Sequence, residues 1–316
     1  MKVYVKTPAR LHLGLIDLNG DLGRLFGGLG VGINRPNVIL EAQPSARLSV
    51  TGEKTELVIT LANQFLETFK IKATAQINVK QAIPEHAGLG SGTQTALGVA
   101  TALSKLFNVN ASIQELATAM GRGRRTSVGT AIFEHGGFVV DGGKNINKNS
   151  FPTTILREPF PHDWVFVVAI PDVKKGLAEN EETAAFRKLS PMSAEEAGKI
   201  CRLTMMKLLP SLVERDIKSF GKALTQIQVV IGEYFAETQG GTYSSITATE
   251  GIALMHKLGA YGAGQSSWGP AFYGLTQKKE AKEIKVKIQA FLKESVGGQV
   301  FIAKANNRGA YIKVTK

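Results

Sequence analysis

The sequence contains a single cysteine, Cys201, among its 316 residues. One cysteine excludes an intramolecular disulfide and fits a reducing compartment. Its neighbours Ile200 and Leu203 suggest the face of a helix, so we interpret Cys201 as a core residue rather than a nucleophile.

Long apolar runs are also lacking. No stretch approaches the roughly 20 residues needed to span a bilayer. Residues 1–6 alternate apolar residues with Lys2, Tyr4 and Lys6 and lack the apolar core of a signal peptide. We therefore expect a cytoplasmic protein without a membrane partner.

Acidic residues are scarce relative to basic ones: 26 Asp and Glu stand against 38 Lys and Arg, a net charge of +12. The positive electrostatic potential that this net charge creates favours acidic partners, namely nucleic acid, anionic lipid or a phosphorylated metabolite. The cations are scattered, however, and the densest cluster, residues 122–125, has no aromatic side chains interleaved. This distribution favours a small anion, and we expect no nucleic-acid partner. A merely solvated surface explains most individual charges.

Length and patterning predict two lobes. A chain of 316 residues with 43% hydrophobic and 20% charged residues is an ordinary globular composition, long enough for two domains. Strand and helix patterns alternate in an order that indicates an α+β fold, ending in a predicted strand pair at 300–303 and 311–314. The polar, asparagine-rich segment 144–150 is the predicted linker, which gives lobes 1–148 and 149–316.

A glycine-rich turn at residues 84–95 leads into a segment with the apolar spacing of a helix. The beginning of a helix has unpaired N–H groups and a positive dipole end, so it attracts an anion. The loop offers glycines that permit positive φ and polar side chains that donate hydrogen bonds: Gly88, Gly90, Gly92, Ser91, Thr93 and Gln94. A phosphate or pyrophosphate is the expected guest, although the sequence is neither a P-loop nor a dinucleotide fingerprint. The alternative is a tight strand-to-helix turn whose glycines serve packing only.

The first strand pattern, from Lys2 to Leu15 with a bend at Pro8, places Arg10 and His12 on one face. Such a pair suits the wall of a pocket, and the alternative is a pair that faces solvent. Asp17 follows and could hold a metal ion, orient Arg10 or act as a turn residue.

Three glycine-bearing stretches resemble, in order and spacing, the motifs of the GHMP superfamily of small-molecule kinases and their relatives. Residues 8–14 resemble the first motif, 84–94 the phosphate-binding second motif and 262–270 the third. The resemblance implies a two-lobe α+β fold with an S5-like amino-terminal lobe and a ferredoxin-like carboxy-terminal lobe. It also assigns residues of the third motif to substrate binding, namely Gly262, Gly264, Gln265 and Ser266.

The sequence departs from the kinases after the second motif. Many family kinases carry Ser-Gly-x-Asp there, with the aspartate as base, whereas residues 127–130 read Ser-Val-Gly-Thr. Thr130 cannot serve as that base. Some family kinases lack the aspartate, so an ATP-dependent kinase of a small alcohol stays an alternative. A non-catalytic binder of anions or nucleic acid is a second alternative.

Residues 10–17, 24–30, 90–94, 123–130 and 270–271 resemble one branch of the superfamily, the archaeal β-ribofuranosylaminobenzene 5′-phosphate synthases. The resemblance implies that phosphoribosyl pyrophosphate condenses with 4-aminobenzoate or 4-hydroxybenzoate in methanopterin biosynthesis. Pyrophosphate and CO2 are released and a C-riboside forms, with Mg²⁺ and without ATP.

Arginine forks suit phosphates and carboxylates, so the candidates for these groups are Arg10, Arg24, Arg124 and Arg125. Our hypothesis places His12 and Asp17 beside the reacting centre, where they orient substrate or metal; the alternative is a structural pair. The sequence leaves the metal ligands and the oligomeric state open, a homodimer included.

Overall fold

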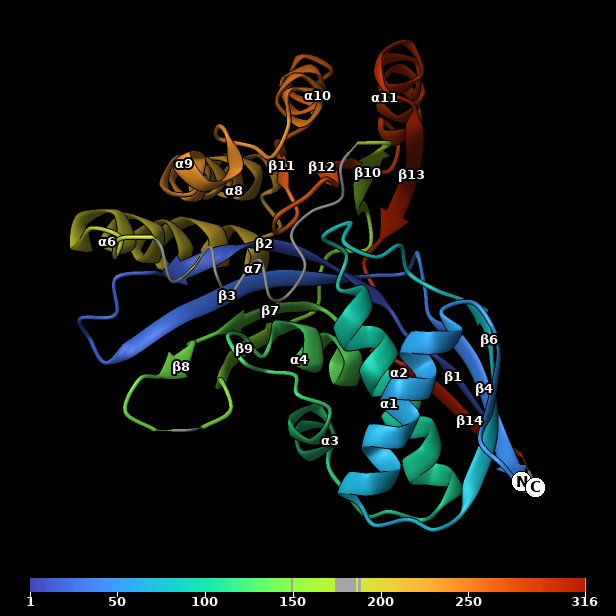
Figure 1. The fold of residues 1–316 in the computed structure, drawn as a ribbon. Helices are drawn as coiled ribbons and strands as arrows, with labels where there is room; N and C mark the ends of the chain where they lie inside the picture. Colours follow the sequence, from blue (N-terminus) through green and yellow to red (C-terminus); the bar gives the residue numbers. More distant parts are fainter. Residues whose placement is uncertain (149, 174–185, 187–188, 316) are drawn as a thin grey trace.

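The computed structural model describes residues 1–316 except 149, 174–185, 187–188 and 316 (Figure 1). Within this described part, the strands form three sheets. No helix in these ranges combines the length and apolar character needed to cross a bilayer.

The first sheet contains both ends of the chain. Its order is β14 (Tyr311–Thr315), β1 (Lys2–Lys6), β4 (Ile39–Ser45), β6 (Thr74–Gln81) and β5 (Ser49–Gly52). Strand β1 alternates as predicted, because Val3 and Val5 are fully buried while Lys2 and Lys6 are exposed. Helix α1 (Thr55–Thr68) connects β5 to its parallel neighbour β6, and α2 (Ser91–Leu106) packs against β1 and β4.

The second sheet lies between two layers of helices (Figure 1). Its order is β2 (Ala9–Asp17), β3 (Arg24–Ile33), β7 (Phe138–Asp141) and β9 (Thr154–Glu158), and β8 (Lys144–Asn145) pairs with β3. Helix α4 (Val128–His135) packs so closely on β3 that a Cβ at Gly30 would lie 2.4 Å from a methyl of Val128. Helix α3 (Ile113–Ala119) begins with a capping box formed by Ser112 and Glu115.

The third sheet is antiparallel and has the order β11 (Gly262–Gln265), β12 (Phe272–Gln277), β10 (Trp164–Pro171) and β13 (Gly298–Lys304). The helices of this half are α6 (Ala194–Leu203), a π-helix (Thr204–Leu208), α7 (Leu209–Val213), α8 (Ile217–Tyr234), α9 (Ala236–Gln239), α10 (Ile246–Lys257) and α11 (Ala281–Ser295). Helices α10 and α11 cover one face of the sheet. The resulting β-α-β-β-α-β order is the expected ferredoxin-like arrangement, and the α+β fold class is confirmed.

Two predictions of organisation need correction. The predicted linker 144–150 begins in β8, and β9, beyond the predicted boundary, pairs with β7. The predicted terminal strands do not pair with each other, because β13 joins β10 and β14 returns to β1. The sheets therefore do not divide at residue 148. Periodicity identifies a strand, but it does not specify the partner strand.

Candidate active site

The glycine loop leads into the first turn of α2, as predicted. Gly88 and Gly90 have φ of 78° and 79°, and Gly90 is the residue at which the helix begins. No side chain caps this end of α2, so its first-turn N–H groups are not consumed by a cap. Ser91, Gly92 and Thr93 line a pocket here.

The three predicted motifs meet at one carbonyl. The carbonyl oxygen of Gly88 accepts hydrogen bonds from the Arg10 guanidinium at 2.9 Å and from the Ser266 hydroxyl at 2.7 Å. The Ser266 hydroxyl in turn accepts the backbone N–H of His12 at 3.0 Å. A Cβ at Gly88 would lie 2.0 Å from the Ser266 carbonyl oxygen, so only glycine permits this approach.

The first of two neighbouring pockets, called the anion pocket below, is cationic and open. It encloses about 1260 Å³ including its mouth, between the glycine loop, Ser267–Gly269 and the loop before α4. Four arginines line it: Arg10, Arg122, Arg124 and Arg125. Within the described lining the single carboxylate is Glu85, whose ion pair with Lys54 measures 2.7 Å. The pocket therefore suits a polyanion.

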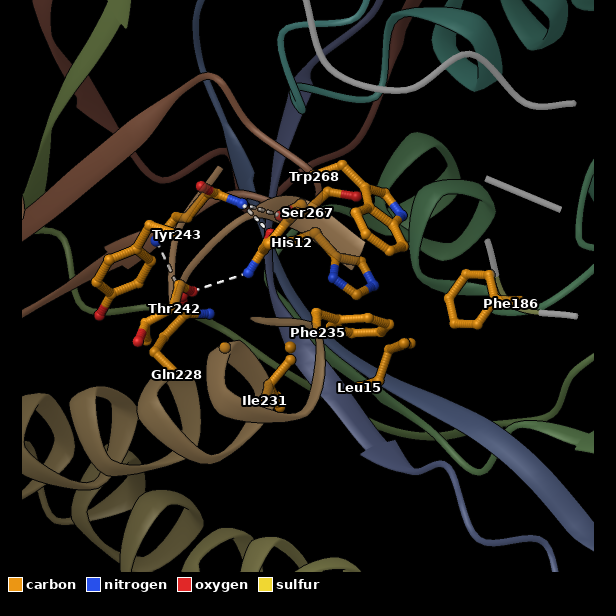
Figure 2. A pocket seen from close by; sticks show the side chains of 14 residues that line it. His12, Leu15, Phe186, Gln228, Ile231, Phe235, Thr242, Tyr243, Ser267 and Trp268 are labelled. Carbon is orange, nitrogen blue, oxygen red and sulfur yellow. Dashed lines mark hydrogen bonds between the residues drawn. The ribbon is translucent and has the colours of Figure 1, made fainter. Parts of the chain in front are cut away.

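The second, called the aromatic pocket below, is narrow and mostly apolar (Figure 2). Its walls include Phe186, Phe235 and Trp268, and the Phe235 and Trp268 ring centroids are 4.6 Å apart. Ser267 and Trp268 line both pockets, so the two cavities share a wall. The Arg125 guanidinium carbon lies 4.8 Å from the Phe186 ring centroid, which places this cation at the junction.

His12 contributes its side chain to the aromatic pocket and is 8% exposed (Figure 2). Burial lowers its pKa from the usual 6.5 to about 3, and the charge of Arg10 acts in the same direction. The imidazole is therefore neutral near pH 7. Arg10 and His12 line the two pockets rather than facing bulk solvent.

Asp17 and Arg24 are not among the described residues that line either pocket, and their proposed roles, Asp17 beside the reacting centre and Arg24 in anion binding, stay predictions. The Asp17 carboxylate accepts the N–H groups of Asn19 at 2.8 Å and Gly20 at 3.2 Å, which makes it a turn residue. The Arg24 guanidinium donates to the carbonyl oxygens of Gly142 at 2.6 Å and Gly143 at 2.8 Å.

Several residues predicted to bind substrate make contacts that hold the walls in place. Gln94 is fully buried, and its side chain donates to the Gly129 carbonyl at 2.9 Å. Gly262 and Gly264 are buried in β11, where a Cβ would meet Gly221 and Gln228 of α8 at 2.5 and 2.4 Å.

The Gln265 side chain lines the aromatic pocket, but its hydrogen bonds serve the neighbouring chain. It accepts the N–H of Ser244 at 2.7 Å and donates to the Ser267 carbonyl at 2.9 Å. Together with Ser266, it fixes the loop that separates the pockets.

Thr130, which stands where many family kinases carry the aspartate, lies on α4 and is 5% exposed. It lines a separate hollow with Ser127 and Glu134 rather than either pocket. Sequence reasoning missed Phe186 and Phe235, because no local pattern links them to the motifs. Trp268 offered a signal, since it lies inside the third motif.

Comparisons with known proteins identify the class. Residues 56–137 match the GHMP kinases N terminal domain and residues 208–294 the GHMP kinases C terminal domain. The crystal structure of homoserine kinase from Cytophaga hutchinsonii superposes with a TM-score of 0.71 and 16% identity, covering 99% of this chain and 97% of that one. At this identity the likeness shows the fold alone, which is that of the GHMP kinases.

Closer relatives define the branch. The β-ribofuranosylphenol 5′-phosphate synthase of Archaeoglobus fulgidus is 35% identical, with 98% of this chain and 99% of the relative covered. That of Methanothermobacter thermautotrophicus is 30% identical, with 99% of both covered. The chain therefore belongs to the family of β-ribofuranosylphenol 5′-phosphate synthases, and the resemblance found in the sequence is confirmed.

Proposed function

We propose that the protein transfers the phosphoribosyl group of phosphoribosyl pyrophosphate to the ring of 4-hydroxybenzoate. The observation that carries this proposal is the shared wall at Trp268, which joins a pocket for a polyanion to a pocket for an aromatic ring. The relatives' name describes a ribosylated phenol, which favours 4-hydroxybenzoate over the 4-aminobenzoate that the sequence also allowed.

The anion pocket would take the phosphorylated sugar. The uncapped N–H groups at Ser91–Thr93 suit the diphosphate, and Arg122, Arg124 and Arg125 suit the 5′-phosphate. The acceptor ring would lie against Trp268 and Phe235, with its reacting carbon directed toward the junction.

The chemistry needs charge stabilisation more than a base. The bond from the ribose C1′ to the diphosphate oxygen breaks, and the diphosphate leaves with the electron pair. The ring carbon that bears the carboxylate forms the new bond to C1′. CO2 then departs, and the electrons of its bond restore the aromatic ring, so no proton need be removed. Preorganised amides and arginines would stabilise the charge that grows on the leaving group.

Magnesium belongs to this proposal as the partner of the diphosphate. The described residues contain no group of three or more His, Cys, Asp or Glu arranged to hold a metal. Mg²⁺ is usually held by substrate phosphates with one or two carboxylates. The described lining offers the hydroxyl of Ser91 and the carboxylate of Glu85, which would have to exchange its ion pair with Lys54 for the metal. The ion would supply positive charge to the leaving diphosphate.

A kinase of a small alcohol is less well supported. A hydroxyl acceptor needs a base near the phosphates, and the carboxylate that the described lining offers, Glu85, is paired with Lys54. The aromatic walls would also have no role in holding a small polar alcohol.

The test supplies phosphoribosyl pyrophosphate, Mg²⁺ and carboxyl-labelled 4-hydroxybenzoate, and measures labelled CO2 and pyrophosphate. We expect both products in equal amounts, with a parallel reaction showing whether 4-aminobenzoate is also accepted. Release of ADP from ATP with a panel of alcohols, and no pyrophosphate from the first mixture, would overturn the proposal in favour of a kinase.

A further inference from the structure

The imidazole of His12 has no hydrogen-bond partner within the described part of the chain. Its backbone N–H and carbonyl are bonded to Ser266 and Ser267, but no described residue contacts its ring nitrogens in this way. Leaving a polar group unpaired in a buried site costs free energy unless a ligand or water completes it. The side chain points into the aromatic pocket (Figure 2).

The other buried polar side chains of this pocket are satisfied. Gln228 donates to the Leu13 carbonyl at 2.7 Å and accepts the N–H of Gln265 at 2.9 Å. Gln265 itself is bonded to Ser244 and Ser267. Thr242, Tyr243 and Ser267 are half-exposed, so water can serve their hydroxyls. Of the described buried polar side chains that line the pocket, His12 is the one whose side-chain nitrogens bond to no described protein group, which leaves them available to a ligand.

The position of His12 along β2 indicates which ligand atom it meets. Arg10 and His12 lie on the same side of the strand, two residues apart, which is about 6.7 Å. Arg10 lines the anion pocket and His12 the aromatic pocket. A ring whose reacting carbon faces the anion pocket places its para substituent away from that pocket, in the direction that leads from Arg10 to His12.

We infer that His12 accepts a hydrogen bond from the para hydroxyl of the acceptor ring and thereby determines the specificity for a phenol. This inference rests on the proposed function and names a contact within the same site. As the ring attacks C1′, positive charge spreads to the para oxygen, and its O–H becomes a stronger donor. A neutral imidazole stabilises that charge more in the transition state than in the ground state, whereas an imidazolium would repel it.

The experiment separates recognition from folding by measuring binding of the ring as well as turnover. Trp268 lines the pocket, and the other tryptophan, Trp164, is 1% exposed in the core, so tryptophan fluorescence reports occupancy of the pocket. The ligands are 4-hydroxybenzoate and 4-methylbenzoate, which has similar shape but no donor. The variants are His12→Phe, which removes the nitrogens, and His12→Asn, which stays polar but is too short to reach.

We expect wild-type protein to bind 4-hydroxybenzoate about tenfold more tightly than 4-methylbenzoate, and both variants to bind them equally. Turnover of 4-hydroxybenzoate should fall about 100-fold in kcat, with the KM for phosphoribosyl pyrophosphate unchanged. Should His12→Phe fail to fold, His12→Asn decides alone. A variant that binds the rings and keeps the wild-type preference would overturn the inference.

The proposed function can fail separately. If wild-type protein releases no pyrophosphate with any acceptor, the reaction is wrong, while the fluorescence preference still tests His12. If wild-type protein turns over but the preference persists without the imidazole, the reaction stands and the assignment of His12 is wrong.

Discussion

The anion pocket and the aromatic pocket share a wall, but loop backbone forms much of the first and side chains from distant elements form the second. Loops form most of the first, namely the glycine turn around Gly88, the arginine-rich segment 122–125 and the loop 267–269. Side chains from strand β2, from helix α8 and from scattered positions form the second. A site made of backbone requires particular φ values at consecutive residues, so it leaves a local signature in the sequence. A site made of side chains requires only that distant residues meet.

The difference also separates the tasks. In the proposed reaction, the anion pocket would stabilise charge that develops on the leaving diphosphate, and the aromatic pocket would select the ring that attacks. Mutations should therefore fall into two kinetic classes, one for each substrate, except at the residues where the pockets meet.

The largest loss of activity should follow Gly88→Ala, a substitution that alters the anion pocket and leaves the side chains of the aromatic pocket in place. The new Cβ would lie 2.0 Å from the Ser266 carbonyl oxygen, so the second and third motifs must separate. We expect kcat/KM to fall at least about 100-fold, because donors that no longer meet the diphosphate lose their stabilisation of the transition state. Pyrophosphate release under subsaturating substrate measures this.

A matched control distinguishes steric conflict from backbone strain. Gly259 has a similar φ of +89°, but nothing lies within 4 Å of the place that a Cβ would occupy there, so Gly259→Ala incurs only the left-handed strain of about 1–2 kcal/mol. Its turnover should remain near wild type. Equal losses of activity in both variants would show that strain, and not the meeting of motifs, governs the site.

Trp268→Ala removes the shared wall and should break the separation into two classes. Because Trp268 lines both pockets, we expect the KM of each substrate to rise about tenfold. Phe235→Ala, by contrast, should raise the KM of the aromatic acceptor alone, since Phe235 lines only the aromatic pocket. Steady-state kinetics with each substrate varied in turn checks both. A Trp268→Ala enzyme with one normal KM would contradict the shared wall.

The neutral state of His12 should appear in the pH dependence of stability. Its pKa is about 3 in the folded protein against 6.5 usually, so as the pH falls the unfolded chain binds the proton first. Stability is therefore lost below about pH 6.5, and from pH 7 to 5 this one group should account for about 2 kcal/mol of unfolding free energy.

Urea unfolding of wild type and His12→Asn at both pH values measures that loss by difference. The variant should lose about 2 kcal/mol less than wild type over the same interval, because it lacks the group that titrates. Parallel curves for the two proteins would mean that His12 titrates normally and is not held neutral.

The contrast explains what could be predicted from the sequence. The glycine turn, the helix that follows it and the fold class were predicted correctly, because each depends on local chemistry or on a motif. The roles of Asp17 and Arg24 stay predictions. Their residue types suit a site, but in this structure the Asp17 carboxylate bonds within a hairpin turn and the Arg24 guanidinium bonds to the carbonyls of Gly142 and Gly143.

The aromatic pocket was missed for a different reason. Phe235 lies at the end of α8 and Phe186 lies far along the chain from β2, and only the tertiary packing brings them to His12 (Figure 2). Strand partners were missed likewise, since the alternation in β14 fits pairing with β1 as well as with β13. The alternation of apolar residues shows which face of a strand is buried, but it does not determine which strand pairs with it.

The smallest expected effect concerns Asp141, a buried carboxylate behind the anion pocket. Its two oxygens accept the N–H groups of Ser127 and Gly143, both at 2.7 Å, and the bond to Ser127 fixes the chain shortly after Arg122, Arg124 and Arg125. In Asp141→Asn one of these N–H groups loses its acceptor, which costs about 1 kcal/mol. We expect the KM for phosphoribosyl pyrophosphate to rise about fivefold and that for the acceptor to stay unchanged.

The difference in KM between Asp141→Asn and wild type should disappear at acid pH, and this pH dependence is the control. Burial raises the pKa of Asp141 to about 6, against partial opposition from its hydrogen bonds, so the wild-type carboxyl takes up a proton in the folded protein below that pH. The protonated oxygen is then a poor hydrogen-bond acceptor, and the amide nitrogen at the same place in the variant is likewise unable to accept the N–H. The ratio of the variant's KM for phosphoribosyl pyrophosphate to that of the wild type should therefore approach one as the pH falls from 8 to 5.5. A ratio independent of pH would show that Asp141 supports the arginine loop through its shape and not through its charge.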